Sequence, residues 1–375
     1  MKVTIIGPAY PLRGGIAHHV YYLKKELSER GHSVQVISFH RLYPALLFPG
    51  KTVLDTSDSK LDAGSVPMLS PLNPITWARA ARAVKAFSPD VVVFQWWHVF
   101  FGMMVGTLAR VFRRNGLQCV LECHNVFPHE GTPFDHLLLK FAAKPIDEFI
   151  THSSSDRRDL APFAAGKRIS VASLPAPSEF FGVGSNPTRA GRTLLFFGMV
   201  RKYKGLDVLL RAMPKVLAHS QGRGCKLLIA GEFYDPVDKY LQLIRELGLE
   251  EQVVLDNRYV PNEEIGSIFD SVDVLILPYL NATQSAVARI ALSNALPLIA
   301  SKSGGLTEVV VENVNGLLFP VGDSDALADQ IISYFTNELG PVFADNLRAA
   351  GGQEPKGLAT LIEDIALGHK ASVPE

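Results

Sequence analysis

Short apolar runs alternate with amphipathic segments along the whole chain. Val3 to Ile6, Val91 to Phe94 and Thr193 to Phe197 are dominated by apolar residues, as is typical of strands buried on both faces of a parallel sheet. Between Ile16 and Leu27, apolar residues recur at spacings of four, three and four, which predicts one buried face of a helix. The alternation of these two patterns predicts an α/β fold with parallel sheets.

The stretch from Asp273 to Ala300 shows this alternation most clearly. An apolar run ending at Leu277 is followed by the polar loop Asn281–Ser285, a helix-compatible segment to Ala295 and a second apolar run from Pro297. Two parallel strands need a crossover helix of about this length. The loop ends where a helix begins, and the free backbone N–H groups there favour an anion. The pattern therefore indicates a phosphate-bearing ligand.

The chain has 375 residues, 47% of them hydrophobic, so it is long enough for two cores. A proline-rich stretch with little periodicity predicts a linker at 179–191. We therefore expect an N-terminal domain at 1–178 and a C-terminal domain at 192–350. Residues 351–375 are predicted to include a last helix, and packing of this helix against the N-terminal domain is one option.

Charge and cysteine content argue against some classes of function and some cellular compartments. Lys plus Arg and Asp plus Glu both number 37, so the net charge gives no reason to expect nucleic acid. The three cysteines form no paired framework, which favours a reducing compartment. The start of the chain lacks a secretory pattern, and no apolar run reaches the ~20 residues of a spanning helix. The expectation is a cytoplasmic protein, with peripheral membrane contact as a further option.

Candidate ligand-binding residues in the first half follow predicted strands. Gly14 and Gly15 precede the first helix, where the backbone can approach a ligand, although a tight turn is the alternative. The loop does not read G-x-G-x-x-G, so a nicotinamide or flavin site is disfavoured. His124 and Asn125 follow the strand that ends near Glu122. An imidazole and an amide at a strand's C-terminal end are candidates for polar substrate contacts.

Aromatic residues in the first half leave two alternatives open. Trp96 and Trp97 end a fully apolar strand, where open α/β sheets place ligands. They are candidates to stack on an acceptor, and core packing has equal support. The apolar residues between Leu42 and Phe48 lie in a poorly periodic stretch, and they fit an acceptor or membrane contact as well as simple packing.

The second half supplies positive charge next to a helix start. Arg201 and Lys204 lie immediately before the predicted helix from Leu206, an arrangement that neutralises a diphosphate. A solvated basic loop is the alternative. Tyr259 and Val260 follow another strand, and their backbone is a candidate to frame a nucleotide base.

Three stretches of the second half closely resemble one large enzyme family. They are Phe196–Asp207, Asp273–Tyr279 and Pro297–Val310. They resemble the retaining glycosyltransferases of family four (glycosyl transferases group 1 type), which include sucrose synthases and many bacterial mannosyl- and glucosyltransferases. The resemblance implies a GT-B fold, with two Rossmann-like doubly wound domains facing across a cleft. It also implies a nucleotide-sugar donor on the C-terminal domain, an acceptor on the N-terminal domain, and neither metal nor cofactor.

The same resemblance implies roles for individual residues. Arg201 and Lys204 match the positions that contact the donor diphosphate, and His124 matches the histidine that contacts the transferred sugar. The pair Gly14–Gly15 matches the glycines that approach donor phosphate and acceptor. The backbone near Ser285 and Ala286 is expected to face phosphate. Gln284 is a further candidate for a sugar-hydroxyl contact.

Two positions depart from the family pattern. Many members have the arginine directly after the glycine of the basic loop, where Met199 stands. The family usually carries two glutamates eight residues apart, and Ala282 and Ile290 occupy those places. Because the second glutamate usually holds the ribose hydroxyls, ribose recognition must differ here. Asp323-Ser-Asp325 matches the D-x-D metal signature of a different transferase fold. It directly precedes a predicted helix and is therefore interpreted as a helix cap.

The expected activity is transfer of a hexose-type sugar from a nucleotide diphosphate to a hydroxyl acceptor, with retention of anomeric configuration and without a metal. The acceptor is expected to be a carbohydrate or a lipid-linked molecule, as in polysaccharide or glycolipid biosynthesis. One alternative is a catalytically silent subunit that binds a nucleotide sugar, which the missing glutamates favour. The other is a sugar-nucleotide epimerase of similar fold.

Overall fold

The computed structural model describes residues 1–42, 52–127, 134–172, 174, 191–350 and 357–372. The predicted linker, apart from Gly191, and the apolar stretch beyond Leu42 lie outside these residues. The chain divides into two compact units. Unit 1 comprises Met1–Asp55, Lys60–Pro175 and Glu354–Glu375, and unit 2 comprises Thr56–Ser59 and Ala176–Gln353. Over the described residues, every helix is too short or too polar to cross a bilayer.

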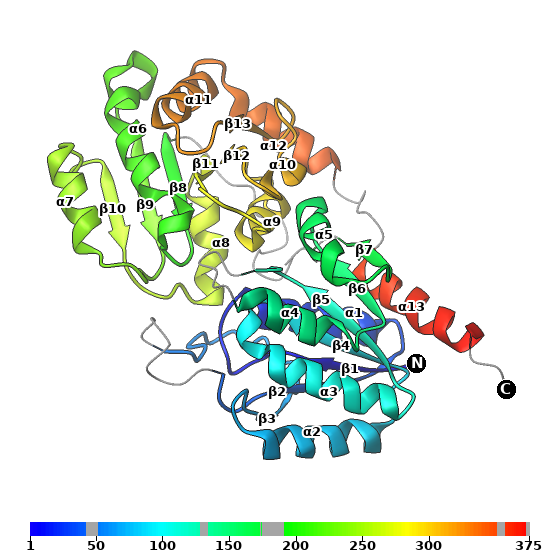
Figure 1. Cartoon of the computed structure of the whole chain (residues 1–375). Helices are drawn as coiled ribbons and strands as arrows, with labels where there is room; N and C mark the ends of the chain where they lie inside the picture. The colour runs from blue at the N-terminus through cyan, green and yellow to red at the C-terminus, as the bar shows by residue number, and fades with distance from the viewer. Residues whose placement is uncertain (43–51, 128–133, 173, 175–190, 351–356, 373–375) are drawn as a thin grey trace. The chain divides into compact units, whose positions relative to one another are not determined.

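Unit 1 is built on a parallel sheet of seven strands in the order β3-β2-β1-β4-β5-β6-β7 (Figure 1). The strands are β1 (Lys2–Ile6), β2 (Ser33–Phe39), β3 (Val66–Leu69), β4 (Val91–Trp96), β5 (Gln118–Cys123), β6 (Glu148–Thr151) and β7 (Ile169–Val171). The order reverses between β1 and β4, and such a switch point is where open α/β sheets bind ligands. A ligand site in unit 1 is therefore expected at the carboxyl ends of β1, β4 and β5.

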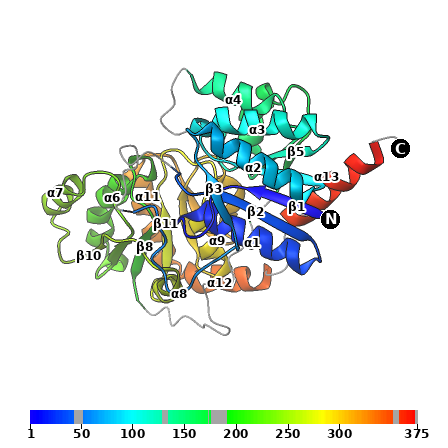
Figure 2. The ribbon, with the colours of Figure 1, turned by 90° about the horizontal axis from the view of Figure 1, so that it is seen from below.

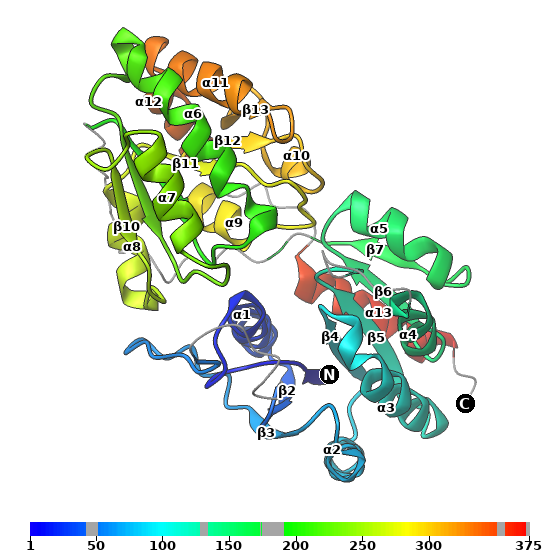
Figure 3. The same cartoon turned by 60° about the vertical axis from the view of Figure 1, so that its left-hand side comes forward.

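Helices cover both faces of this sheet. They are α1 (Gly15–Glu29), α2 (Pro74–Phe87), α3 (Gly102–Arg114), α4 (Asp135–Ala143), α5 (Ser154–Leu160) and α13 (Leu358–Ser372). Figures 2 and 3 show α2, α3 and α4 on one side of the strands, with α1 and α13 on the other. The sheet is thus doubly wound, as the apolar strands predict.

Alternation along the strands explains the two cores of unit 1. Ile6 and Phe94 pack with α2, α3 and α4, whereas Ile5 and Val93 pack with α1 and α13. Successive side chains of a strand point to opposite faces, so each central strand contributes to both cores. Complete burial of a side chain of this size contributes about 1.5–3 kcal/mol.

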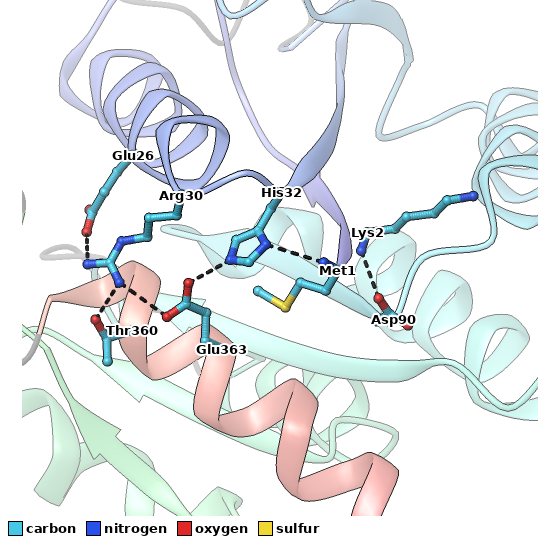
Figure 4. Close-up of polar contacts among 8 residues, drawn as sticks. All are labelled: Met1, Lys2, Glu26, Arg30, His32, Asp90, Thr360 and Glu363. Atoms are coloured by element: carbon cyan, nitrogen blue, oxygen red, sulfur yellow. Dashed lines mark hydrogen bonds and ion pairs between the residues drawn. The ribbon is translucent and has the colours of Figure 1, made fainter.

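The C-terminal helix α13 belongs to unit 1 although it is far from it in sequence. Its apolar residues, including Ile362, join the core formed by α1. Figure 4 shows the polar contacts beside that core. The Arg30 guanidinium donates to Thr360 Oγ1 at 2.9 Å and lies 3.2 Å from a Glu363 oxygen. The other oxygen of Glu363 lies 2.6 Å from His32 Nε2, so helix α13 is held by both apolar and charged contacts.

Unit 2 has a parallel six-stranded sheet in the order β10-β9-β8-β11-β12-β13. The strands are β8 (Thr193–Phe197), β9 (Lys226–Ala230), β10 (Val253–Asp256), β11 (Val274–Leu277), β12 (Leu298–Ser301) and β13 (Gly316–Phe319). The helices are α6 (Leu206–Ala218), α7 (Asp238–Glu246), α8 (Asn262–Asp270), α9 (Ala286–Ser293), α10 (Leu306–Val309), α11 (Ser324–Thr336) and α12 (Leu339–Ala350). One core joins the sheet to α6, α7 and α11, and α6 and α11 lie side by side in Figure 1.

A short segment from the first half of the chain completes unit 2. The predicted boundary at residue 178 did not anticipate that Thr56–Ser59 would belong here. The backbone N–H of Asn262 donates to Ser57 Oγ at 3.0 Å, and its side-chain amide donates to the Ser59 carbonyl at 3.1 Å. The Glu263 carboxylate accepts from the backbone N–H of Asp58 at 3.0 Å. These bonds satisfy backbone groups at the start of α8, which explains why the segment joins this unit.

Candidate functional site

The loop that carries the two candidate cations of unit 2 runs from Gly198 to Gly205, between β8 and α6. Gly205 has a φ of 68°, and a Cβ added there would lie 2.0 Å from the Pro278 carbonyl oxygen. Only glycine fits this close approach. The end of the basic loop is therefore fixed against the end of β11.

Lys204 is a buried cation. The residue is only 6% exposed, and its Nζ lies 5.5 Å from the centre of the Tyr279 ring. Among the residues that the structure describes, no carboxylate forms an ion pair with Lys204. Burial lowers the pKa of Lys204, and the neighbouring charge of Arg201 lowers it further. A buried ammonium without an acidic partner is costly unless an anion binds to it.

Arg201 adds a second positive charge three residues before Lys204. It is exposed, and its Cζ lies 5.2 Å from the centre of the Tyr234 ring. In the described part of the chain it makes no ion pair either. The loop thus presents the buried Lys204 beside the exposed Arg201 and Lys202. Lys204 and Arg201 have no carboxylate partner among the described residues, an arrangement that suits a phosphate.

The start of α9 is held in place by side-chain hydrogen bonds. The Ser285 hydroxyl accepts from the Ala288 backbone N–H at 3.1 Å. Burial raises the pKa of Tyr279 to about 12, and a hydrogen bond with Ser285 opposes that rise. Ala286, the first residue of the helix, is exposed. Ser285 thus caps the helix, and the residue next to it is exposed.

Gly304 and Gly305 fix the loop that precedes α9. A Cβ added at Gly304 would lie 1.7 Å from the Ala282 carbonyl oxygen, and one at Gly305 would lie 2.0 Å from the Thr283 carbonyl oxygen. These close contacts hold the loop against the end of β12. Gln284 in the same loop is half-buried.

The two positions where the family usually has glutamate are apolar and inside the protein. Ala282 is 4% exposed and Ile290 is 8% exposed. Neither can offer a carboxylate to a ribose. The Val260 side chain is also buried at 6% exposure, and Tyr259 is half-buried. Any contact of Val260 with a base would use its backbone, as the sequence analysis expected.

The metal pattern considered from the sequence is a helix cap. Asp323 precedes α11, and its carboxylate accepts from the Ala326 backbone N–H at 2.9 Å. The interpretation of Asp323-Ser-Asp325 as a cap is therefore confirmed.

The glycines of unit 1 lie at the start of α1. Gly14 has a φ of 117°, and a Cβ added there would meet no atom within 4 Å. Its backbone angle, and not crowding, requires glycine. No side chain caps the N-terminus of α1.

His124 follows β5 and lies in a buried polar network. Its backbone N–H donates to the Trp96 carbonyl at 2.8 Å. Its Nε2 lies 2.6 Å from Gln95 Oε1, and the Gln95 amide nitrogen donates to Glu122 Oε2 at 2.7 Å. Burial lowers the pKa of His124 well below its ordinary value, and the charge of His19 adds to that effect.

Two further histidines complete this network, and of its members only His124 was selected from the sequence. His19 Nε2 lies 2.5 Å from Glu122 Oε1, and His152 Nε2 lies 3.0 Å from the same oxygen. Burial alone would raise the pKa of Glu122, but the charges of His19 and His152 and the hydrogen bond with His152 hold it well below its ordinary value. The rings of His124 and His152 are 5.1 Å apart.

Strand register explains why these residues meet. Gln95 and Glu122 are direct neighbours on β4 and β5, and Cys123 pairs with Thr151. His124 and His152 each follow these paired residues, so both lie at the carboxyl edge of the sheet. A glutamate inside the otherwise apolar strand Gln118–Cys123 was the signal that could have found the network, because such a residue is rarely buried without a partner.

The two tryptophans have different surroundings. Trp96 is fully buried, and its indole N–H donates to the Val126 carbonyl at 3.3 Å. It is a core residue, so it cannot stack on an acceptor. Trp97 is half-buried, with its ring 4.2 Å from that of Phe101. Trp97 and the half-buried Asn125 remain candidates for acceptor binding.

Comparisons with known proteins match both halves of the chain. A family model described as glycosyltransferase family 4 matches residues 13–175, and one described as glycosyl transferases group 1 matches residues 191–337. The D-inositol 3-phosphate glycosyltransferase of Corynebacterium diphtheriae is 31% identical over 144 residues, which are 37% of this chain and 33% of that protein. The chain spans about a third to a half of the length of this relative and of several others that it matches.

Solved structures match over the whole length. The sucrose-phosphate synthase of Thermosynechococcus elongatus is 17% identical with a TM-score of 0.76, and 100% of both chains is covered. The Anabaena protein HepE, solved in complex with UDP-glucose, is 16% identical with a TM-score of 0.73, and again 100% of both chains is covered. Two parallel Rossmann-like units and these likenesses establish the GT-B fold that the sequence predicted. The chain belongs to glycosyltransferase family 4, the glycosyl transferases group 1 type.

Proposed function

We propose that the protein transfers a hexose from a nucleotide diphosphate to a hydroxyl acceptor with retention of anomeric configuration. In this proposal, unit 2 binds the donor and no metal is needed at the diphosphate. The observation that carries the proposal is Lys204, a buried cation without an acidic partner among the described residues. HepE, a protein of the same fold, was solved with UDP-glucose, which supports a nucleotide sugar as the donor.

The chemistry explains why fixed positive charge is useful here. As the bond from the anomeric carbon to the diphosphate breaks, an oxocarbenium ion develops on the sugar and negative charge grows on the leaving phosphate. Lys204, Arg201 and the backbone at Ser285 and Ala286 are proposed to stabilise that charge. Because these groups are held in place before the reaction, they need little reorganisation during it.

The residues of unit 1 are proposed to bind the transferred sugar and the acceptor. His124, which is buried at 9% exposure, is proposed to contact a hydroxyl of the transferred sugar. Burial lowers the pKa of His124, which favours the neutral ring. Because Nε2 donates to Gln95 Oε1, Nδ1 is the nitrogen left to accept from a sugar hydroxyl. Gly14 and Gly15 are proposed to let the backbone approach the donor phosphate, and Gln284 to contact a sugar hydroxyl.

A panel of GDP-, UDP- and ADP-hexoses tests the proposal. The correct donor raises the melting temperature, because a ligand at 100 times its Kd stabilises the folded state by about 2.7 kcal/mol. The same donor then releases nucleoside diphosphate with and without an acceptor, and NMR reports the anomeric configuration of the product. Inversion of configuration, or no stabilisation by any member of the panel, contradicts the proposal.

A second candidate function is a silent subunit that binds a nucleotide sugar without transferring it. The observation that favours it is the burial of Ala282 and Ile290 where the family usually has glutamates. Donor stabilisation without any release of nucleoside diphosphate, in the presence of every acceptor tried, would support this candidate over the enzyme.

A further inference from the structure

Glu122 and the three histidines around it bring four potential metal-ligand atoms close together. His19, Glu122, His124 and His152 each offer one ligand atom, and these atoms all lie within 4.8 Å of one another. The four residues are 5%, 0%, 9% and 4% exposed. They come from α1, from β5 and its end, and from the end of β6. Four converging donors from separate elements form a site that is built into the fold.

The hydrogen bonds of His152 define where its lone pair points. Its Nδ1 lies 2.9 Å from the Ala172 carbonyl oxygen. A carbonyl only accepts, so Nδ1 carries the hydrogen. In the neutral ring, Nε2 is then a lone pair that faces Glu122 Oε1 at 3.0 Å. Two lone pairs at this distance repel each other unless a proton or a metal ion lies between them. A histidine that donates one N–H to a backbone carbonyl is also the usual arrangement of a metal ligand.

His19 provides a second, independent observation. Its Nε2 is 2.5 Å from Glu122 Oε1, yet among the described residues neither buried ring nitrogen has a hydrogen-bond partner of suitable geometry. The two atoms are close without being aligned for a hydrogen bond. The His19 nitrogen and the Glu122 oxygen therefore lie side by side, and an ion could bind to both once their separation opens.

We propose that His19, Glu122, His124 and His152 bind one divalent transition-metal ion of the zinc class. Three imidazoles and one carboxylate suit Zn²⁺, and also Co²⁺, Ni²⁺ or Fe²⁺, better than Mg²⁺ or Ca²⁺, which prefer oxygen ligands. With four protein ligands the site is closed, as structural zinc sites are. The ion holds α1 to the ends of β5 and β6.

Zinc binding requires the separations between the four ligand atoms to change. Zinc–ligand bonds of about 2.0–2.2 Å place tetrahedral ligand atoms about 3.4 Å apart. His19 must therefore move away from Glu122 by about 1 Å from its 2.5 Å separation, and the most distant pair, at most 4.8 Å apart, must close by a similar amount. Rotation of the imidazole rings achieves both movements without a change in the sheet. The metal site shares His124 with the proposed sugar contact, so an ion on one ring nitrogen leaves only the other for a sugar hydroxyl. The measurement of bound metal does not depend on the transfer reaction.

Metal analysis of the purified full-length chain tests the site. The chain, free of any histidine tag, is stripped with a chelator, incubated with Zn²⁺, freed of excess metal and measured by mass spectrometry. The expected result is one zinc ion per chain. Zinc at 100 times its Kd should raise the melting temperature by roughly 5 °C. Cobalt in place of zinc should give the visible absorption of a tetrahedral site.

Variants locate the ion. His19→Gln and His152→Gln should each lose the bound zinc and the cobalt absorption, whereas His40→Gln, which removes an exposed histidine of the same unit, should keep both. Circular dichroism checks that the variants are folded. Wild-type protein that retains no zinc, cobalt, nickel or iron after incubation overturns the proposal whatever the variants do, and leaves a cluster held by protons alone. Zinc retained equally by folded His19→Gln and His152→Gln variants also overturns it.

Discussion

The basic loop of unit 2 and the histidine–glutamate network of unit 1 bury charge in opposite ways. Lys204 is buried with no acidic partner among the described residues, next to the exposed Arg201. Glu122 is buried with two histidines on one carboxylate oxygen and Gln95 on the other. Removing one partner of a buried, paired charge destabilises the fold because the other partner is left unpaired, whereas a buried charge without a partner favours binding of an oppositely charged ligand. The difference predicts that stability depends mainly on Glu122 and donor binding mainly on Lys204.

The largest effect is expected at Glu122. Glu122→Ala leaves His19, His152 and Gln95 buried without their shared partner, and breaking a buried ionic network in this way costs about 3–5 kcal/mol of unfolding free energy. Urea denaturation of the protein measures the loss. Glu122→Gln keeps the shape and one acceptor oxygen, so it should lose less. Equal stability of wild type and Glu122→Ala would show that the network does not hold unit 1 together.

The next largest effect is expected at Lys204, where substitution should lower activity without lowering stability. Lys204→Met keeps most of the packed stem and removes the charge, so kcat/KM should fall by about 2–4 kcal/mol, the range for losing one donor to a developing anion. Burial lowers the pKa of Lys204, which means that the charged form is less favourable in the folded protein than in the unfolded one. At neutral pH the Met variant should therefore melt at the same or a higher temperature.

Lys202→Met is the matched control for that experiment. Lys202 lies in the same turn but is exposed, so its loss should change neither kcat/KM nor the melting temperature appreciably. If Lys202→Met and Lys204→Met lose activity equally, the loop acts through its overall charge and the buried position of Lys204 has no special role.

These two regions also differ in how far the sequence could predict them. Arg201 and Lys204 are close in sequence, follow an apolar strand and precede a helix, so a local pattern was enough to select them. The second network combines residues from α1, β4, β5 and β6. The pairing of β4 with β5 and of β5 with β6, together with the packing of α1 on the sheet, brings its parts together. No spacing along the chain reveals these contacts. His124 was selected alone because it follows a strand.

Other features of the fold show the same limit. The apolar runs predicted the parallel strands, because burial on both faces leaves a continuous local signal. The apolar runs did not reveal which of the two tryptophans at the end of β4 lies in the core. Trp96 is fully buried, whereas the adjacent Trp97 is half-buried. The placement of Thr56–Ser59 in unit 2 depends on hydrogen bonds to Asn262 and Glu263, which are about 200 residues away in sequence.

A smaller effect is expected from Gln95, which links His124 to Glu122. Gln95→Leu removes a hydrogen-bond partner from both of these buried groups, which costs about 1–3 kcal/mol. Gln118→Leu is the matched control, because Gln118 is about as buried but its side-chain oxygen has no hydrogen-bond partner in the part of the chain that the structure describes. Urea denaturation should show a clear loss for the first variant and a change within about 0.5 kcal/mol for the second. The reverse order would contradict the proposed network.

The smallest effect is expected at Arg201, because its charge is exposed to water. Arg201→Ala should lower kcat/KM by about 1 kcal/mol, less than the loss at Lys204, since solvent weakens the interaction of an exposed cation with phosphate. Salt sharpens the contrast, because the screening length falls from about 8 Å at 0.15 M to about 3 Å at 1 M and affects exposed charges most. The difference between wild type and Arg201→Ala should shrink at high salt, while the difference between wild type and Lys204→Met should persist. If both differences shrink together, salt screens Lys204 as strongly as Arg201 when the donor is bound. The burial of Lys204 would then not explain a larger contribution to kcat/KM.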